Sequence, residues 1–359
     1  MKLSYILFAL PAAALSQGLT AGPSVVHISK EWNDVFPYKN FNRNVTVPVW
    51  ETSLLPSAPP SSEISEDLEI IANASFIAYD DSFYKLLKIS SHLDEKRVEE
   101  IFTFPPPPAY AQRQIHDGTV YVPEINSLFT AELFSPKPGH GMQAIPYIWK
   151  TDISDSTNPI TSKVYPSPPL TIANGAYYFN GSVYWAQEGN YTTPSAVVRM
   201  DPVTLKTEVV KNNFYGHRFN SINDIVAGAA EGALFNPNGL AFNADETKLF
   251  VTNRGNTSAD PHGGRTIYSH HITGNALSNR EIYAYADAGF PDGIKTDKEG
   301  RVYAAVTGSV DVFDKGGLLL GRIKVAKGDV AVNMAWAGSW LYVFGREKIY
   351  RIELGTTER

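Results

Sequence analysis

The chain has 359 residues with a formal net charge of −6, and 43% of its residues are hydrophobic against 19% charged. It carries no long basic run, which argues against a nucleic-acid partner, because phosphate binding needs clustered Lys and Arg. The chain has no cysteine, which excludes disulfides, thiolate chemistry and thiolate-bound zinc. Its 19 Tyr, 18 Phe, 27 Gly and 24 Pro favour many short strands joined by turns.

Residues 1–16 have the pattern of a secretory signal peptide. Lys2 supplies the positive start, Leu3 to Leu15 form an apolar stretch, and Ser16 ends a small-residue cleavage sequence. An uncleaved anchor helix is the alternative, but the apolar run is short for a bilayer span, and no later segment approaches that length. We therefore expect a secreted, extracellular protein that does not span a membrane.

Five Asn-X-Ser/Thr sequons agree with secretion and predict a glycoprotein. Their acceptor residues are Asn44, Asn73, Asn180, Asn190 and Asn256.

Residues 17–73 differ in character from the rest and are predicted to be an N-terminal extension with a Pro/Ser-rich linker at 55–62. Residues 74–79 predict an isolated strand, and the charged segment 94–101 predicts a short helix. The domain that follows is expected to span residues 74–359.

A hairpin-like unit recurs through this domain, with two short apolar strands on either side of a turn rich in Asn, Asp or Gly. Its copies cover residues 121–129, 177–185, 241–251, 294–303 and 335–343. Polar residues precede most copies. They are Asp117-Gly118, Asn174-Gly175, Asn223-Asp224, Asn238-Gly239, Asp292-Gly293 and the single Asn333.

The spacing of these polar residues predicts a β-propeller. Successive first residues are 57, 49, 15, 54 and 41 positions apart, and a four-stranded blade takes roughly 40–50 residues. The spacing of 15 leaves no room for a blade between Asn223 and Asn238. The last copy is also short of strands, so we expect the strand near residues 74–79 to complete it by pairing with residues 348–354.

Inner strands of a propeller begin at one mouth of the central channel, so these polar residues are expected to converge there. Asp117, Asn223, Asn238 and Asp292 would present two carboxylates and two amide oxygens, a set that suits Ca²⁺ best and Mg²⁺ or Mn²⁺ less well. The alternative is that each Asn or Asp only turns the chain before a strand.

Four motifs in order give a more specific indication. Residues 115–124 are similar to an "HEGPVYVPE" opening, 218–224 to "FNSxND", 235–240 to "PNG", and 290–293 to "PDG". Together they resemble the SMP-30/gluconolactonase/LRE-like family, in particular its secreted fungal lactonohydrolase-like branch. The similarity runs from about residue 74 to the C-terminus.

This resemblance implies a six-bladed propeller that hydrolyses lactones with one divalent cation in its channel. It implies that Asp117, Asn223, Asn238 and Asp292 bind the cation, which polarises the lactone carbonyl, while Asp292 activates water. His116 is expected to orient the substrate. Asn174, which opens another blade at the same mouth, is expected to line the pocket.

The sequence departs from the family pattern at two places. Asp117 stands where the family has Glu, so its carboxylate reaches one methylene less far. Most of one blade is missing between Asn223 and Asn238, through a gene-model error, splicing or decay. Two alternatives to an enzyme therefore stay open: a non-catalytic secreted propeller that binds a ligand or partner, and an inactive product of a truncated gene model.

Other catalytic classes find no support, because the chain has neither a Gly-X-Ser-X-Gly elbow nor a Gly-rich phosphate loop. We expect a monomer whose partner is a small lactone. Sugar lactones, pantolactone-like lactones and aromatic lactones all stay open as substrates.

Overall fold

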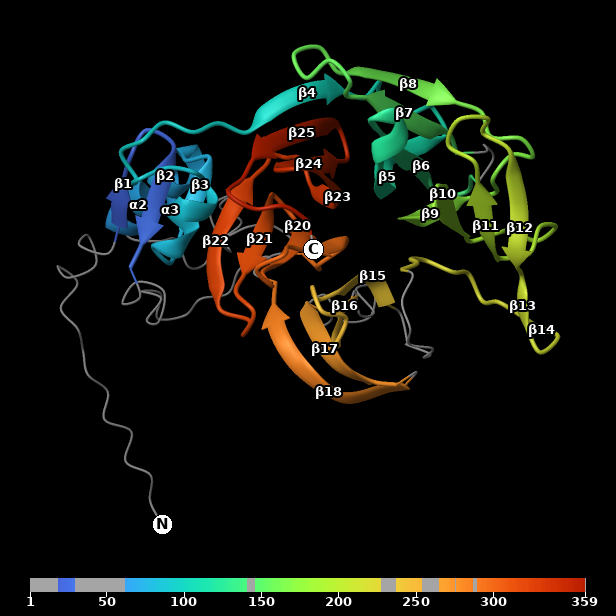
Figure 1. The fold of residues 1–359 in the computed structure, drawn as a ribbon. Coiled ribbons are helices and arrows are strands. Elements are labelled where there is room, and N and C mark those ends of the chain that lie inside the picture. The colour runs from blue at the N-terminus through green and yellow to red at the C-terminus, as the bar shows by residue number, and fades with distance from the viewer. Residues whose placement is uncertain are drawn as a thin grey trace.

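The computed structural model describes residues 19–29, 62–140, 146–226, 237–253, 265–274, 276–286 and 289–358. Within these ranges the chain is built of short antiparallel strands grouped into four four-stranded sheets, one seven-stranded sheet and a small hairpin. Figure 1 shows the sheets arranged around a centre in a propeller-like manner, with the C-terminus near that centre. The all-β, propeller-like fold predicted from the sequence is thus confirmed, whereas the number of six blades stays a prediction.

The first two sheets follow the chain order from the inner to the outer strand. One contains β5 (Ala111–Val122), β6 (Ser127–Pro136), β7 (Ile148–Asp152) and β8 (Ile160–Val164). A single 3-10 turn at Pro123–Ile125 joins β5 to β6. The next contains β9 (Ala173–Phe179), β10 (Ser182–Gln187), β11 (Ala196–Met200) and β12 (Thr207–Lys211). The small hairpin of β13 (Asn213–Phe214) and β14 (His217–Arg218) follows.

The remaining sheets repeat this order. The third contains β15 (Pro237–Phe242), β16 (Lys248–Asn253), β17 (Thr266–Thr273) and β18 (Ala276–Tyr285). The fourth begins with β19 (Ile294–Thr296), β20 (Val302–Val306), β21 (Ser309–Phe313) and β22 (Leu319–Lys324). The fifth contains β23 (Ala331–Ala337), β24 (Trp340–Gly345), β25 (Lys348–Glu353) and, from the N-terminal part of the chain, β4 (Glu99–Thr103).

The five predicted hairpins are confirmed as the two inner strands of the five sheets. The β9–β10 hairpin shows why the sequence is informative here. Asn180 and Gly181 at its turn both have positive φ, of 47° and 77°. A two-residue turn of this kind matches the right-handed twist of the flanking strands and requires residues that tolerate positive φ.

The strand that completes the last sheet is not the predicted one. Residues 76–78 form β3, but β3 pairs with β22 of the preceding sheet. Strand β4 pairs with β25 instead, and this strand replaces the helix expected at 94–101. Charge complementarity explains the choice, since Arg351 binds Glu99 and Lys348 binds Glu100, each at 2.7 Å.

The N-terminal segment adds further strands to the fourth sheet. Strand β1 (Leu19–Ala21) pairs with β2 (Val25–Ile28), and β2 pairs in parallel with β3 (Phe76–Ala78), which makes that sheet seven-stranded. Helices α2 (Ser62–Asn73) and α3 (Ser82–Leu86) lie beside these strands (Figure 1). Parts of the segment 17–73, expected to be an extension and linker, therefore belong to a sheet. No described helix is both long and apolar enough to cross a membrane.

Apolar clusters join neighbouring sheets in sequence around the centre. Buried side chains link the sheet of β5 to that of β9, the sheet of β15 to that of β19, the sheet of β19 to that of β23, and the sheet of β23 back to that of β5. Among the described residues, no buried cluster joins the sheets of β9 and β15. The predicted missing blade falls at this junction, and residues 227–236 between the two sheets lie outside the described ranges.

Candidate metal centre

Most of the polar residues predicted to converge lie on or next to the inner strands of the sheets. Asn174 and Asn238 are the second residues of β9 and β15, and Asp292 stands two residues before β19. Asp117 lies inside the long strand β5, at a register shift between it and Val120. Asn223 belongs to a segment without regular structure that follows β14.

Contacts between these residues connect one inner strand to the next. Asn333 on β23 donates from Nδ2 to Asp117 Oδ1 at 2.6 Å, and Asn238 Nδ2 donates to Asp292 Oδ1. The backbone N–H of Gly175 donates to Asn223 O at 2.8 Å. These bonds link Asp117 to Asn333, Asn238 to Asp292, and Asn223 to the segment of Asn174.

Glycine follows the polar residue in most pairs because the inner strands approach each other closely. A Cβ on Gly118 would overlap the carbonyl oxygen of Asn174, and the φ of Gly118 is +64°. A Cβ on Gly293 would overlap the side chain of Asn333. Only a residue without a side chain allows this approach, so each glycine brings the next polar residue inward.

Asp224 connects the two sheets that share no apolar cluster. Its Oδ2 accepts a hydrogen bond from the N–H of Leu240 at 3.0 Å, and its Oδ1 accepts one from Ile225 N at 2.7 Å. We name the set of Asp117, Asn174, Asn223, Asp224, Asn238, Asp292 and Asn333 the polar ring. Through Asp224 and Leu240 the polar ring continues across the junction where the blade is predicted to be missing.

Burial raises the pKa of two carboxyl groups in the polar ring. For Asp224 burial raises the pKa to about 7; the positive charge of Lys295 opposes this change and the negative charge of Asp117 adds to it. Burial also raises the pKa of Asp117, against the hydrogen bonds from Asn333 and Gly118 and the charge of Lys295. Both carboxylates thus lie where an additional positive charge would stabilise their ionised forms.

Two buried amide oxygens of the polar ring, Asn174 Oδ1 and Asn223 Oδ1, have no hydrogen-bond partner among the described residues. Asn174 Nδ2 donates to Glu188 Oε1 at 2.5 Å, which orients its amide. An unpaired buried oxygen is costly, and a bound cation would satisfy it. Carboxylate and amide oxygens are the donors that Ca²⁺ prefers, so this donor set fits a hard divalent cation.

Within the described residues, no group of three His, Asp or Glu side chains lies close enough together to hold a metal. The polar ring is consistent with this finding, because four of its seven members are asparagines. Any cation held here would depend on amide as well as carboxylate oxygens.

The ring of His116 packs between two sheets. Its ring stacks on Phe104 with centroids 3.5 Å apart and an interplanar angle of 6°, and its Nδ1 lies 3.3 Å from Gly345 O. Burial lowers the pKa of His116 to about 3, so the imidazole stays neutral at physiological pH. The expected role of His116 in orienting the substrate stays a prediction, and the position of its ring shows a packing role.

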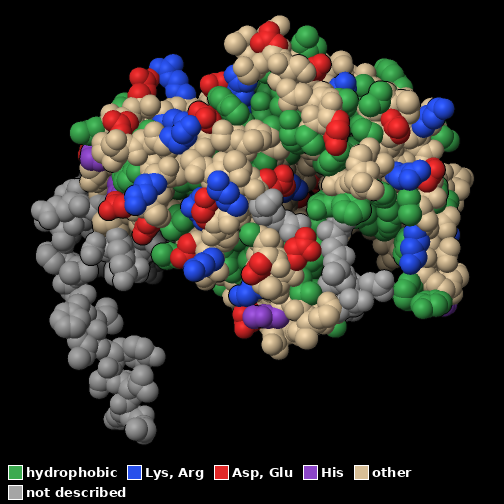
Figure 2. Space-filling model, in the orientation of Figure 1, with side chains coloured by type: hydrophobic (Ala, Val, Ile, Leu, Met, Phe, Trp, Pro, Cys, Tyr) green, Lys and Arg blue, Asp and Glu red, His purple; other side chains and the backbone are tan. Residues whose placement is uncertain are grey.

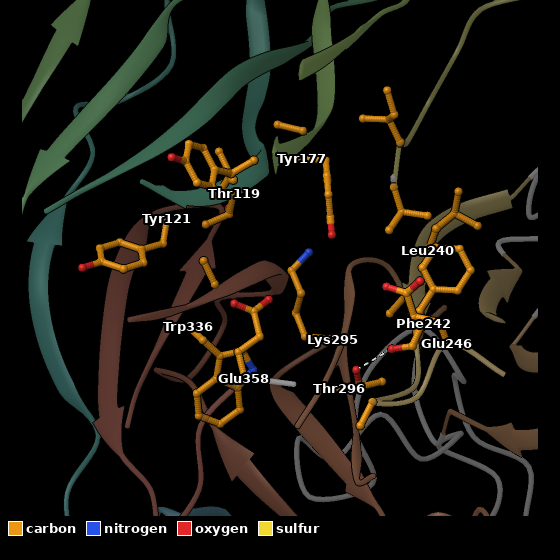
Figure 3. Close-up of a pocket in the computed structure, with 18 of the residues that line it drawn as sticks. Thr119, Tyr121, Tyr177, Leu240, Phe242, Glu246, Lys295, Thr296, Trp336 and Glu358 are labelled. Carbon is orange, nitrogen blue, oxygen red and sulfur yellow. Dashed lines mark hydrogen bonds between the residues drawn. The ribbon is translucent and has the colours of Figure 1, made fainter. Parts of the chain in front are cut away.

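A cavity of about 450 Å³ lies next to the polar ring, along the same inner strands. Its walls include Thr119, Tyr177, Leu240, Lys295, Trp336 and Glu358. Figure 3 shows the Lys295 side chain extending into this space, with Tyr177 ahead of it and Glu358 beside it. Lys295 is not among the residues predicted from the sequence. Its position three residues after Asp292 was the available signal.

Comparison with known proteins relates part of the chain to one family. Residues 173–343 match the SMP-30/gluconolactonase/LRE-like region, so this part of the chain is similar to that family. Lactonohydrolase oryL of Aspergillus oryzae is 26% identical over 365 residues, which cover 82% of this chain and 77% of that protein. A gluconolactonase of Zymomonas mobilis is 26% identical over 228 residues, which cover 49% of this chain and 61% of that protein.

Solved structures of SMP-30/gluconolactonase relatives agree with the fold. The gluconolactonase XC5397 of Xanthomonas campestris superimposes with a TM-score of 0.57 at 19% identity, covering 77% of this chain and 94% of that one. A second structure, described as a putative gluconolactonase, gives a TM-score of 0.58 at 17% identity, covering 79% and 99%. At these identities the likeness concerns the fold.

Proposed function

We propose that this chain is a secreted lactone hydrolase that works with a divalent cation held at the polar ring. The observation that carries the proposal is the convergence of the four family motifs at one connected cluster of oxygens. Two of those oxygens, on Asn174 and Asn223, are buried and find no hydrogen-bond partner in the described part of the chain. The lactonohydrolase and gluconolactonase names of the relatives supply the reaction class.

Asp117, Asn223, Asn238 and Asp292 would hold the cation, with Ca²⁺ as the ion that best suits these donors. Bound there, the cation would polarise the lactone carbonyl and stabilise the negative charge that develops on its oxygen. Asn238 now donates its Nδ2 to Asp292, so its amide would turn to present oxygen. Asn174 lies in the same polar ring and would contact the substrate.

Asp292 would act as the general base. Its carboxylate takes a proton from water, and the oxygen of that water forms a bond to the lactone carbonyl carbon. The ring C–O bond then breaks, and the proton held by Asp292 passes to the departing alkoxide. One lactone and one water thus give one hydroxy acid, and Asp292 returns to its ionised form.

The test is a panel of sugar, pantolactone-like and aromatic lactones, assayed on the full chain with Ca²⁺ and with excess chelator. We expect opening of at least one lactone with Ca²⁺ and loss of that activity in chelator. Equal rates in both conditions would exclude the metal mechanism. Binding of Ca²⁺ without the opening of any lactone would favour a non-catalytic propeller instead.

The architecture that we propose is a six-bladed ring that lacks most of one blade between Asn223 and Asn238. The lack of a described apolar cluster between the sheets of β9 and β15 supports it. Sequencing the transcript across residues 225–234 checks whether the gap is genuine. A transcript with a blade-length insertion there would show a gene-model error.

Secretion, with cleavage after residue 16, is also part of the proposal. Asn73, Asn180 and Asn190 are exposed, as glycan acceptors must be, while Asn44 and Asn256 lie outside the described residues. The acidic and basic side chains are interspersed on the face shown in Figure 2, with no continuous basic patch. Expression in a secreting fungal host should give protein in the medium whose mass falls on treatment with an endoglycosidase. Retention of unglycosylated protein in the cells would contradict secretion.

A further inference from the structure

Lys295 is a positively charged residue beside the polar ring. Its residue is half-buried on β19, its side chain extends into the cavity beside the polar ring, and none of the described residues forms a hydrogen bond or ion pair with its ammonium group. Unpaired ammonium groups in enclosed sites are costly unless nearby negative charge compensates them. The surroundings of Lys295 supply that charge.

Negative groups surround the cavity on several sides. Glu246 and Glu358 line it together with Lys295. Thr119, two positions after Asp117, and Ile225, directly after Asp224, belong to the same walls. Lys295 is the only basic residue among the described lining residues. Its charge therefore faces the carboxylates of the polar ring from the cavity side.

The charges of the polar ring do not balance with a divalent cation alone. Asp117, Asp224 and Asp292 carry three negative charges when ionised, and a divalent cation offsets two of them. Both carboxylate oxygens of Asp224 accept hydrogen bonds, from the backbone N–H groups of Ile225 and Leu240. Asp224 therefore adds negative charge to the site without being free to bind the ion. Within the polar ring one negative charge is then left, and Lys295 is the only basic side chain among the described residues that line the neighbouring cavity.

We propose that Lys295 is the internal counter-ion of the polar ring: it offsets the third carboxylate, so the site is matched to a divalent rather than a trivalent cation and releases its ion more readily. The proposal rests on the cation site proposed above. Lys295 is a positioning residue in this scheme, since it acts on the ion through charge and makes no contact with substrate.

Removing this charge should have opposite effects on the free and the loaded protein. In Lys295→Met the repulsion between the ammonium and the bound ion disappears. Lys295 lies three residues after Asp292, so their Cα atoms are at most roughly 10 Å apart. At that distance, with an effective dielectric constant of about 40, Ca²⁺ should bind roughly tenfold more tightly. The free protein should melt at a lower temperature, because its carboxylates lose their counter-ion.

The dependence on ion charge gives the sharper readout. The repulsion scales with the charge of the ion. Lys295→Met should therefore bind Tb³⁺ roughly thirtyfold more tightly than the wild type does, and the ratio of its Tb³⁺ affinity to its Ca²⁺ affinity should rise about threefold. Calorimetric titration with Ca²⁺ and Tb³⁺ luminescence on the full chain, with melting curves of the metal-free protein, measure these changes without any substrate. Lys295→Arg should behave like the wild type, since it keeps the charge.

Lys298→Met is the matched control. Lys298 lies three residues further along the chain, is exposed, and approaches Glu299 at 4.0 Å, so its loss should leave the affinities for both ions unchanged. An unchanged or weakened Ca²⁺ affinity in Lys295→Met would overturn the counter-ion proposal, as would an equal gain in Lys298→Met. A wild type that binds no divalent cation would instead overturn the proposed metal site itself.

Discussion

Asp292→Asn should reduce lactone hydrolysis by roughly a hundredfold to ten-thousandfold, the range expected for loss of a positioned general base. Asparagine keeps an oxygen of similar size at the same place but cannot accept the proton of the attacking water. The loss should appear in kcat, while Ca²⁺ still binds, more weakly because one carboxylate charge is gone. Steady-state kinetics and calorimetric titration on the same preparation measure both effects.

Asn238→Ala separates the role of a ligand from the role of a base. This variant removes an amide oxygen but leaves the Asp292 carboxylate, so its activity should fall through weaker metal binding and recover as Ca²⁺ is raised. Asp292→Asn should not recover at any Ca²⁺ concentration. If saturating Ca²⁺ restores Asp292→Asn to the wild-type rate, Asp292 is a ligand only and another group activates the water.

Phe104→Ala should have the largest effect on stability, lowering the free energy of unfolding by about 3–5 kcal/mol. The Phe104 ring is 5% exposed, stacks on His116, and meets Trp149 edge-on with ring centroids 5.4 Å apart. Its N–H donates to Glu347 O at 2.7 Å. Phe104 therefore packs the strand that completes the last sheet against the first sheet, and its truncation leaves a cavity between them.

Urea denaturation measures this change, with Phe214→Ala as the control. Phe214 on β13 is 54% exposed, so its truncation should alter the free energy of unfolding by no more than about 0.5 kcal/mol. Similar losses in the two variants would show that the packing between the first and last sheets adds little to stability. Ca²⁺ affinity should also fall in Phe104→Ala, because His116 precedes Asp117 in the chain.

The hairpins were predictable because their signals are local. Asn180 and Gly181 specify a tight turn by their tolerance of positive φ, and the apolar residues on either side specify strands. The polar ring was predictable for a related reason. Its residues recur at one place in each repeat, and a repeated unit brings equivalent positions to the same mouth. Asp117, Asn238 and Asp292 could therefore be assigned to one cluster before their contacts were known.

Which strand pairs with a given short strand is not determined by local sequence. The sequence predicted residues 74–79 as the strand that completes the last sheet and residues 94–101 as a helix, and the tertiary structure uses residues 99–103 for that sheet instead. Glu99 and Glu100 meet Arg351 and Lys348, whereas β3 lies against β22. These contacts join residues about 250 positions apart, so no local pattern contains them.

The sequence by itself determined the hairpin repeat, the turn residues and the polar residues that meet at the polar ring, because periodicity and backbone preference are local. Only the tertiary structure decided which strand completes each sheet, that His116 packs on Phe104, and that Lys295 extends into the cavity. The physical reason is that burial and charge depend on which distant segments pack together.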